Sequence, residues 1–314
     1  MDATAGRAHG RNHALDRVDA TTTGGYDPPV VRHLQYRLWD VFTDRPLAGN
    51  ALAVFTDATG LDAATMQAVA RELNLSECTF VLRPTAPEAE ARIRIFTPST
   101  ELPFAGHPTL GTAFALTAPV QRETLIRIET TRAVVTVKLT RGPDDAVFGW
   151  MTQPIPDRRP FVETDELLAA LGVASSGLPI ELYDNGPRHV QVELASPQAV
   201  AALAPDLARL VAYGSVTFTV CARIDGARWK SRVFAPGGGI PEDPATGSAA
   251  GPLCWHLARH GRIAFGDEIV IEQGAEVGRP SILHARVFGT SKKVDRVEVG
   301  GHAVAVGTGE LVLP

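Results

Sequence analysis

The alternation of apolar and polar residues predicts many short strands and few helices. Between residues 91 and 95, alanine and isoleucine alternate with arginine, the pattern of a half-buried strand. Apolar residues recur at helical spacing from Met66 to Leu73, and Asp62 precedes them as a helix N-cap. The same patterns place further strands at 34–42, 51–55, 79–82, 135–139, 180–183, 190–194, 216–221, 268–272, 282–287, 294–299 and 309–313, and further helices near Pro108 and at 164–171, 197–203 and 248–260.

Two parts of the chain repeat each other. Six pairs of identical residues are each separated by 138 positions: Thr79 and Thr217, Phe80 and Phe218, Arg94 and Arg232, Phe96 and Phe234, Pro98 and Pro236, Pro103 and Pro241. Both copies continue into a segment of small residues, 105–113 in the first and 245–251 in the second. This repetition indicates an internal duplication, and therefore two similar halves with a site in the cleft between them.

Long β stretches with few helices predict an α+β fold rather than an alternating parallel sheet. We expect an N-terminal domain at 34–148, a C-terminal domain at 149–302, and a last strand, about 303–314, that returns to the first domain. Residues 1–33 are polar and lack the apolar stretch of a secretory signal. We expect them to form a disordered extension.

Composition narrows the possible functions. The chain has 314 residues, 45% hydrophobic and 21% charged, which is ordinary for a globular protein of two domains. A net charge of −5 with mixed signs gives no electrostatic reason to expect nucleic-acid binding. No apolar run approaches the ~18 residues of a membrane span. Three scattered cysteines predict neither a disulfide framework nor a zinc site, and favour the cytoplasm.

The small-residue segments predict two helix N-termini that bind anions. Small side chains at 111–113 and 249–251 leave the first turns accessible, and strands can surround such helices closely. Free N–H groups at a helix N-terminus attract carboxylates. If both ends face one cleft, they form a polar trap for a small acid.

Four residues near these segments are candidates for chemistry. Glu77 is either a solvated loop carboxylate or a general base, whose pKa would be raised where polar neighbours are few. His107 follows Gly106 at the first helix, where the helix N-terminus favours the neutral imidazole. Asp243 and Ser248 precede and begin the second helix, so turn formation or capping is the alternative to a functional role.

Other motifs fail on their spacing. The segment 247–251 resembles a hydrolase elbow, but Thr246 stands where the first glycine should be. His256 and His260 have the spacing of the zinc motif H-E-x-x-H, but the residue after His256 is not glutamate. We therefore expect no metal. Three glycines at 237–239 are not followed by the lysine of a phosphate loop. No nucleotide site is therefore expected, and the triple glycine is interpreted as a flexible turn.

Several segments carry a resemblance to a known family. Gly49-Asn50 and residues 74–77 (NLSE), 101–108 (ELPFAGHP) and 242–251 (EDPATGSAAG) resemble the phenazine-biosynthesis isomerase family, which has the diaminopimelate epimerase fold. The resemblance extends from about Tyr36 to Leu313. Residues 185–190, 256–261 and 277–281 are similar to the members that act on trans-2,3-dihydro-3-hydroxyanthranilate.

The resemblance implies two domains, each a central helix wrapped by a mostly antiparallel, barrel-like sheet. It implies a homodimer, no cofactor and a small carboxylate-bearing cyclic substrate. It implies that Glu77 takes a proton from C3 of the ring and returns it at C1, giving an enol that becomes a ketone. His107, Asp243 and Ser248 match positions that hold the substrate or move protons, and the backbones of Gly106 and Gly247 match positions that approach it.

Alternatives remain open at this point. The chain departs from the family pattern at Cys78, where serine or threonine is expected. A related isomerase could act on another small cyclic or amino acid, and a binding protein could use the same scaffold. A two-thiol racemase is disfavoured, because neither small-residue segment contains cysteine. The 138-residue offset of the repeat makes Ser215 the counterpart of Glu77, and serine is not acidic. We therefore expect a single base that transfers the proton on one face of the substrate.

Overall fold

A computed structural model describes residues 31–313. Residues 1–30 of the extension predicted for residues 1–33 lie outside the described residues. The first strand begins at Arg32, two residues before the expected limit, because Arg32 and His33 pair with Leu313 and Val312.

The first half contains eight strands and two helices among the described residues. Their bounds are β1 Arg32–Val41, β2 Asn50–Phe55, α1 Ala63–Leu73, β3 Glu77–Leu82, β4 Ala91–Phe96, β5 Glu101–Leu102, α2 Gly106–Thr117, β6 Glu123–Glu129, β7 Val134–Arg141 and β8 Val147–Gln153. Helix α1 begins at the predicted N-cap, where Oδ1 of Asp62 accepts a hydrogen bond from the backbone N of Thr65. The apolar pattern did not predict β6 or β8.

The second half repeats this order of elements from β10 onwards, with β9, α3, one further short helix and two 3-10 helices added. Their bounds are β9 Asp157–Pro160, α3 Thr164–Leu171, β10 Glu181–Asp184, β11 Arg188–Glu193, α4 Pro197–Ala201, α5 Leu207–Val211, β12 Val216–Asp225, β13 Arg228–Ala235, η1 Pro236–Gly238, β14 Ile240–Asp243, α6 Gly247–Arg259, β15 Glu268–Gln273, η2 Ala275–Val277, β16 Ser281–Gly289 and β17 Val294–Leu313.

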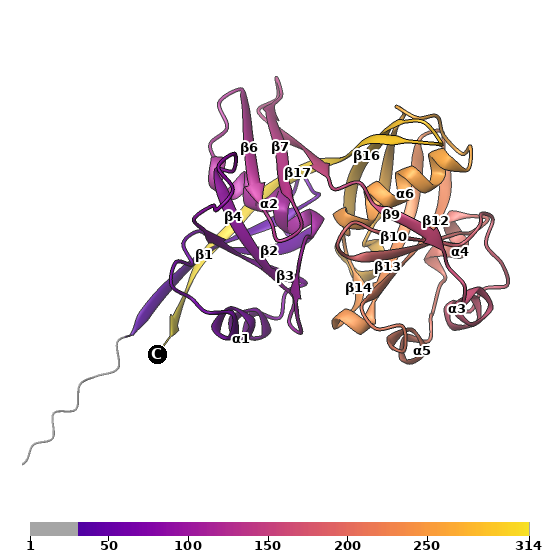
Figure 1. Ribbon diagram of the computed structural model, residues 1–314, viewed down its shortest axis with the longest axis horizontal. Helices are drawn as coiled ribbons and strands as arrows, with labels where there is room; N and C mark the ends of the chain where they lie inside the picture. The colour runs from indigo at the N-terminus through magenta and orange to yellow at the C-terminus, as the bar shows by residue number, and fades with distance from the viewer. Residues whose placement is uncertain (1–30, 314) are drawn as a thin grey trace, which may run out of the picture.

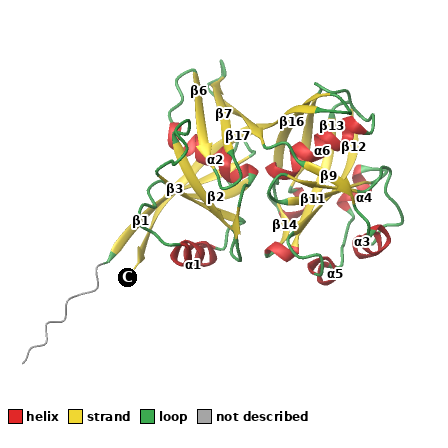
Figure 2. Ribbon diagram, viewed as in Figure 1, coloured by secondary structure: helices red, strands yellow, loops and turns green. Residues whose placement is uncertain are grey.

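Strand pairing in the two halves follows one scheme. In the first half β2 and β3 are parallel, β4 is antiparallel to β3 and parallel to β6, and β6, β7 and β8 are antiparallel neighbours. In the second half β11, β12, β13, β15, β16 and β17 repeat these relations in the same order. Strands surround α2 in one half and α6 in the other (Figures 1 and 2). The predicted α+β fold with two pseudo-symmetric halves is confirmed.

Strand β17 joins the halves. Residues 294–300 pair with β16, residues 297–302 also pair with β8, and residues 303–313 pair with β1. Figure 1 shows this strand leaving the second half and running beside β1. Two separate strands were predicted here because glycines interrupt the apolar pattern, but pairing on both sides keeps the backbone extended. The return to β1 is in keeping with the predicted domain limits, which stay a prediction.

The repeat has a different register from the one that the sequence suggests. Ile95 pairs with Leu102 on β5, and its counterpart Val233 pairs with Asp243 on β14. Leu102 therefore corresponds to Asp243, so the counterpart of Pro103 is Pro244 and not Pro241. The three-residue shift falls at the triple glycine of residues 237–239, which has no equivalent in the first half.

Two features that both halves share stabilise β4 in the first half and β13 in the second, the strands that lead towards α2 and α6. Arg94 makes a two-pronged ion pair with Glu101, and Arg232 makes the same pair with Glu242. Each arginine also lies over the phenylalanine two residues later on its strand. These pairs position the loops that lead into α2 and α6.

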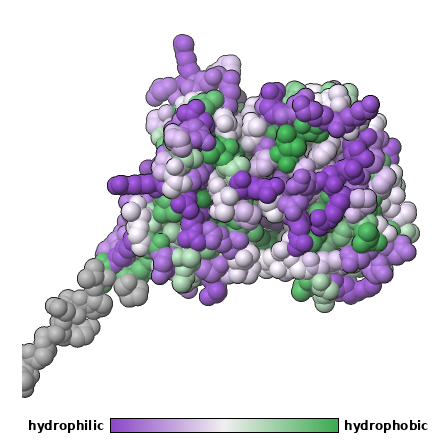
Figure 3. All heavy atoms as spheres, viewed as in Figure 1, coloured by the Kyte–Doolittle hydropathy of each residue, from purple (hydrophilic) through white to green (hydrophobic). Residues whose placement is uncertain are grey.

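The core lies inside the two halves. Helix α2 is buried on nearly all sides, as its high proportion of small and apolar residues predicts, and it shares one apolar cluster with α6. Hydrophilic residues cover much of the surface in Figure 3. Within residues 31–313, no helix has the length and apolar character that crossing a membrane requires.

Candidate functional site

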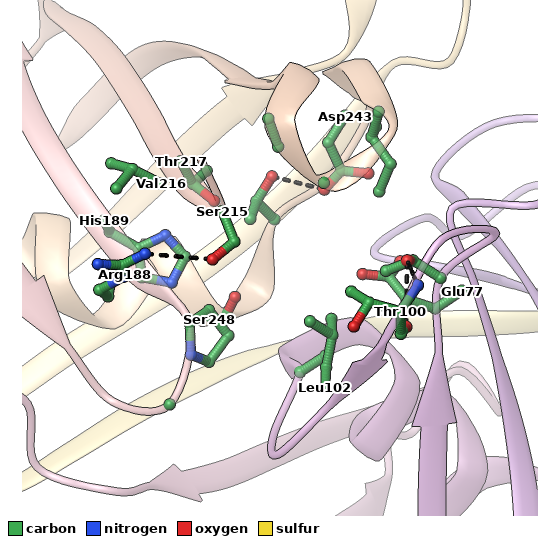
Figure 4. A pocket seen from close by; sticks show the side chains of 18 of the residues that line it. Glu77, Thr100, Leu102, Arg188, His189, Ser215, Val216, Thr217, Asp243 and Ser248 are labelled. Carbon is green, nitrogen blue, oxygen red and sulfur yellow. Dashed lines mark hydrogen bonds between the residues drawn. The ribbon is translucent and has the colours of Figure 1, made fainter. Parts of the chain in front are cut away.

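A pocket of about 210 Å³ lies between the two halves. Its lining includes Glu77 and Ala105 from the first half, and Asp243 and Ser248 from the second. Figure 4 shows Glu77 on one side and Ser248 and His189 across from it, with Asp243 between them. The site therefore lies in the cleft that the sequence repeat predicts.

Glu77 is the first residue of β3 and is almost fully buried. Helix α1 ends at Asn74, whose left-handed backbone turns the chain towards β3. The residue is only 7% exposed, so the alternative of a solvated loop carboxylate is wrong. Burial, reinforced by the nearby charge of Asp243, raises the pKa of Glu77 well above its ordinary value. A carboxyl group of this kind is suited to accept and return a proton.

His107 lies directly beside this carboxylate. Its Nε2 is 3.4 Å from Oε2 of Glu77, and neither atom has another partner within the described residues. Its Nδ1 is 3.2 Å from the side-chain nitrogen of Asn50, which can only donate. The proton of the neutral ring therefore sits on Nε2, the nitrogen nearer Glu77, but the two groups do not meet the geometry of a hydrogen bond. Burial lowers the pKa of His107 to about 3, which keeps the ring neutral.

Asp243 is held by side chains on both of its oxygens. Oδ1 accepts a hydrogen bond of 2.8 Å from Nδ2 of Asn50, and Oδ2 accepts one of 2.6 Å from the hydroxyl of Thr246. Gln273 donates to the backbone oxygen of Asp243. Burial raises the pKa of Asp243. The predicted turn role is thus present in the bond to Thr246, but Asp243 also faces the pocket.

Both helices begin at the pocket. Neither N-cap residue, Ala105 for α2 or Thr246 for α6, provides a side-chain cap. Ser248 lies inside α6 and lines the pocket, so its alternative role as the N-cap is wrong. The N-cap side chains of both helices leave the N–H groups of the first turns uncapped, and the binding of a small acid by these groups stays a prediction.

Gly106 and Gly247 touch each other at the start of the two helices. A Cβ atom on Gly106 would lie 2.4 Å from the backbone of Gly247 and Ser248. A Cβ atom on Gly247 would lie 2.8 Å from Phe42. Only glycine at these positions allows the two helices to start this close together. Neither glycine is part of the pocket lining, and its predicted approach to the substrate stays a prediction.

The duplication does not repeat the base. Cys78 pairs with Phe96, and Phe218 pairs with Phe234, so Cys78 corresponds to Phe218. The counterpart of Glu77 is therefore Thr217, not the Ser215 that the sequence offset indicates. Neither residue is acidic, so the pocket has one glutamate of this kind and not two.

The cysteines take no part in the pocket. Cys78, Cys221 and Cys254 are buried, free and absent from its lining. Cys78 packs in an apolar cluster with Phe80 and Met66, and burial raises the pKa of its thiol to about 12. The departure from the family pattern at Cys78 thus places a thiol with a raised pKa on the face of β3 that packs in the apolar cluster and not in the pocket.

Sequence reasoning missed Asn50 as a site residue. Its side-chain NH₂ group has two hydrogens and lies 2.8 Å from Oδ1 of Asp243, 3.0 Å from the carbonyl of Ala245 and 3.2 Å from Nδ1 of His107, so it shares its hydrogens among three acceptors. Asn50 begins β2, and Gly49 before it has a positive φ and no room for a Cβ atom. The Gly49-Asn50 pair was the only signal in the sequence.

One cluster outside the pocket has ligand-type side chains. Glu181, His256 and His260 bring ligand atoms within 4.8 Å of one another. Oε1 of Glu181 is already 2.6 Å from Arg158 and 3.5 Å from Arg259. These cations disfavour a metal ion, because they neutralise the carboxylate that would bind it.

Comparison with known proteins places this site in context. Residues 39–309 match the family model of phenazine biosynthesis-like proteins. The chain is 49% identical over 278 residues to the trans-2,3-dihydro-3-hydroxyanthranilate isomerase of Pseudomonas chlororaphis, covering 88% of this chain and 99% of that one.

Solved structures agree with the fold. A phenazine biosynthesis protein of the PhzF family from Bacillus anthracis superposes with a TM-score of 0.75 at 25% identity, over 90% of this chain and all of the other. A hydroxyproline epimerase from Agrobacterium vitis shares the fold with a TM-score of 0.62 at 14% identity, over 90% of this chain and 92% of the other. Because the family model matches residues 39–309 and the relative from Pseudomonas chlororaphis is 49% identical, this chain belongs to the phenazine biosynthesis-like protein family.

Proposed function

We propose that this protein is an isomerase that moves a proton from C3 to C1 of trans-2,3-dihydro-3-hydroxyanthranilate without a cofactor. The observation that carries the proposal is the buried carboxyl group of Glu77, which faces a pocket between two helix N-termini and is the only buried glutamate in the lining of that pocket among residues 31–313. The substrate is suggested by the name of the 49% identical relative.

In the proposed reaction, Glu77 takes the C3 proton as the carboxylate. The electrons of the broken C–H bond enter the conjugated ring, and its double bonds move by one position. Glu77, now protonated, returns the proton at C1 and regains its charge. The enol formed at C3 then becomes a ketone. One base on one face suffices, because C3 and C1 lie on the same ring and the pocket limits access of water.

The surrounding groups serve this transfer. Nε2 of His107 lies 3.4 Å from the Glu77 carboxylate, and a small rotation of either side chain would let its N–H donate to that carboxylate after ionisation. The first turns of α2 and α6 present backbone N–H groups to the negative charge of the substrate. We assign Asp243 and Ser248 to the substrate's polar groups, since both line the pocket from the second half. The backbones of Gly106 and Gly247 fix the distance between these groups.

The test is turnover followed by ultraviolet absorbance, with Glu77→Gln as the inactive variant and Glu72→Gln as the matched control. Glu72 is exposed on α1, five residues before the proposed base. We expect wild-type turnover, no measurable turnover in Glu77→Gln, and unchanged turnover in Glu72→Gln. Absence of wild-type turnover would overturn the substrate assignment. Full activity of Glu77→Gln would overturn the base assignment alone.

A labelled substrate tests the one-base route. With deuterium at C3, a single buried carboxyl group should carry part of the label to C1. Complete loss of the label to solvent would contradict direct return by Glu77. A second candidate, an isomerase acting on another small ring, predicts binding of small cyclic acids but no turnover of this substrate.

We also propose a cytoplasmic homodimer, as the family resemblance implies. Light scattering on the purified full-length chain tests the dimer, and a mass of one chain, 33.4 kDa, would contradict it.

A further inference from the structure

The pocket has a second buried histidine on the side opposite Glu77. His189 lies on β11, is 1% exposed and lines the pocket. Neither of its ring nitrogens has a hydrogen-bond partner among residues 31–313. Figure 4 shows it beside Thr217, across from Glu77. A buried polar ring with both nitrogens unpaired is costly unless something binds there.

His189 does not stand alone. Gln191 follows it on the same face of β11, and Thr219 is the register partner of Gln191 on β12. The amide of Gln191 and the hydroxyl of Thr219 are both buried, and neither has a partner in the described part of the chain. A row of unpaired polar groups thus leads from the pocket along β11 and β12.

The first half shows that this row is not demanded by the fold. The register of β2 with β3 makes Leu52 the counterpart of His189 and Val54 the counterpart of Gln191. Both counterparts are apolar and belong to the core. Thr79, the counterpart of Thr219, is satisfied by a 2.9 Å hydrogen bond to Thr112 on α2. Among these corresponding positions, the unpaired polar side chains therefore lie in the second half only, and His189 among them faces the pocket opposite the proposed base.

The chemistry of the proposed substrate indicates which of its groups would bind at His189. C3 is tetrahedral and bears both the hydrogen that is removed and the hydroxyl group. When that hydrogen points at Glu77, the hydroxyl points to the other side of the ring. A neutral imidazole can both donate to and accept from a hydroxyl group.

We propose that His189 binds the C3 hydroxyl of the substrate and, with Gln191 and Thr219 behind it, forms a subsite opposite the base. This inference rests on the proposed function. Burial lowers the pKa of His189 to about 3, so the ring acts as a neutral hydrogen-bonding group and not as a cation. The subsite selects rings that carry a hydroxyl group at the reacting carbon.

The experiment measures binding without turnover. In a Glu77→Gln background, titration calorimetry compares trans-2,3-dihydro-3-hydroxyanthranilate with 2,3-dihydroanthranilate, which lacks the hydroxyl. Replacing His189 with leucine, the residue at the counterpart position, should reduce the preference for the hydroxylated ring by about tenfold. His189→Gln should restore part of it, and His33→Gln, at an exposed position, should leave it unchanged.

The outcomes separate the two proposals. If the His189→Leu variant prefers the hydroxylated ring as strongly as the protein with His189 does, the subsite is wrong and the proposed function is unaffected. Failure of the Glu77→Gln protein to bind either ring would overturn the proposed substrate together with the subsite. If His189→Leu does not fold, ¹⁵N NMR of the Glu77→Gln protein decides. The His189 ring nitrogens should shift on binding the hydroxylated ring and stay in place with the other, and a shift common to both ligands would contradict the subsite.

Discussion

The side-chain nitrogen of Asn50 lies 3.2 Å from Nδ1 of His107, and this contact decides where the imidazole proton resides. Because an amide NH₂ cannot accept, Nδ1 must be the unprotonated nitrogen. ¹⁵N NMR at neutral pH should therefore show His107 as a neutral ring with its proton on Nε2. A wild-type ring protonated on Nδ1 would contradict this relationship.

Loss of the amide should release the ring. In Asn50→Leu, NMR should show a mixture of tautomers, and kcat should fall by about tenfold, the effect of one lost orienting hydrogen bond. His107→Phe measures the full contribution of the ring to turnover. An Asn50→Leu variant with a single Nε2–H tautomer and unchanged kcat would show that another group orients His107.

Glu77 should reduce stability at high pH. Its pKa is raised by burial, so the folded protein keeps the proton to a higher pH than the unfolded chain. Stability therefore falls as pH rises from the ordinary value of 4.5 through the raised pKa. Glutamine does not ionise, so Glu77→Gln should raise Tm at pH 8 by roughly 2–4 °C.

Thermal unfolding across pH checks this sign. The advantage of Glu77→Gln should shrink as pH falls and vanish below about pH 4.5, where both states of the wild type are protonated. The exposed control Glu72→Gln should follow the wild-type curve. A variant that is less stable than wild type at pH 8 would show that ionised Glu77 is well solvated or paired.

The contact between Gly106 and Gly247 should tolerate no side chain. Gly106→Ala places a methyl group 2.4 Å from the backbone of α6, so we expect a loss of about 3 kcal/mol, the upper part of the range for overpacking. Gly307→Ala is the matched control, because open space surrounds a Cβ atom there. Urea unfolding measures both, and equal stabilities would show that the helix ends move apart at little cost.

The duplicated ion pair offers a comparison within one chain. The Arg232 side chain is 9% exposed and also donates to the carbonyl of Leu203, whereas the Arg94 side chain is 20% exposed. Arg232→Ala leaves Glu242 nearly buried without its partner and should cost about 3–5 kcal/mol. Arg94→Ala should cost about 1 kcal/mol, as for a solvated pair. Urea unfolding that ranks Arg94→Ala as the more damaging change would contradict this difference in burial.

Much of the site could be predicted from local sequence. The repeat indicated two halves, and the small-residue segments indicated two helices that meet at a cleft. Glu77, Asp243 and Ser248 all line that cleft, and His107 lies directly behind Glu77. These predictions succeed because helix starts and strand ends are encoded within a few residues.

Long-range pairing could not be predicted in the same way. Asn50 acts on Asp243, 193 positions away, and nothing near Asn50 in the sequence indicates that partner. The counterpart of Glu77 was also misplaced, because sequence identity aligned Thr79 with Thr217 while the strand register aligns Glu77 with Thr217. Register depends on hydrogen bonds between strands, which a repeat of a few residues does not specify.

Strand β17 has a consequence for the order in which the molecule can be completed during synthesis. Its last residues, 303–313, complete the sheet beside β1, which leaves the ribosome among the first described segments. The first half therefore has one edge of β1 unpaired until residues 303–313 of β17 have been synthesised. A nascent chain at that stage presents an open strand edge, the kind of surface that chaperones protect.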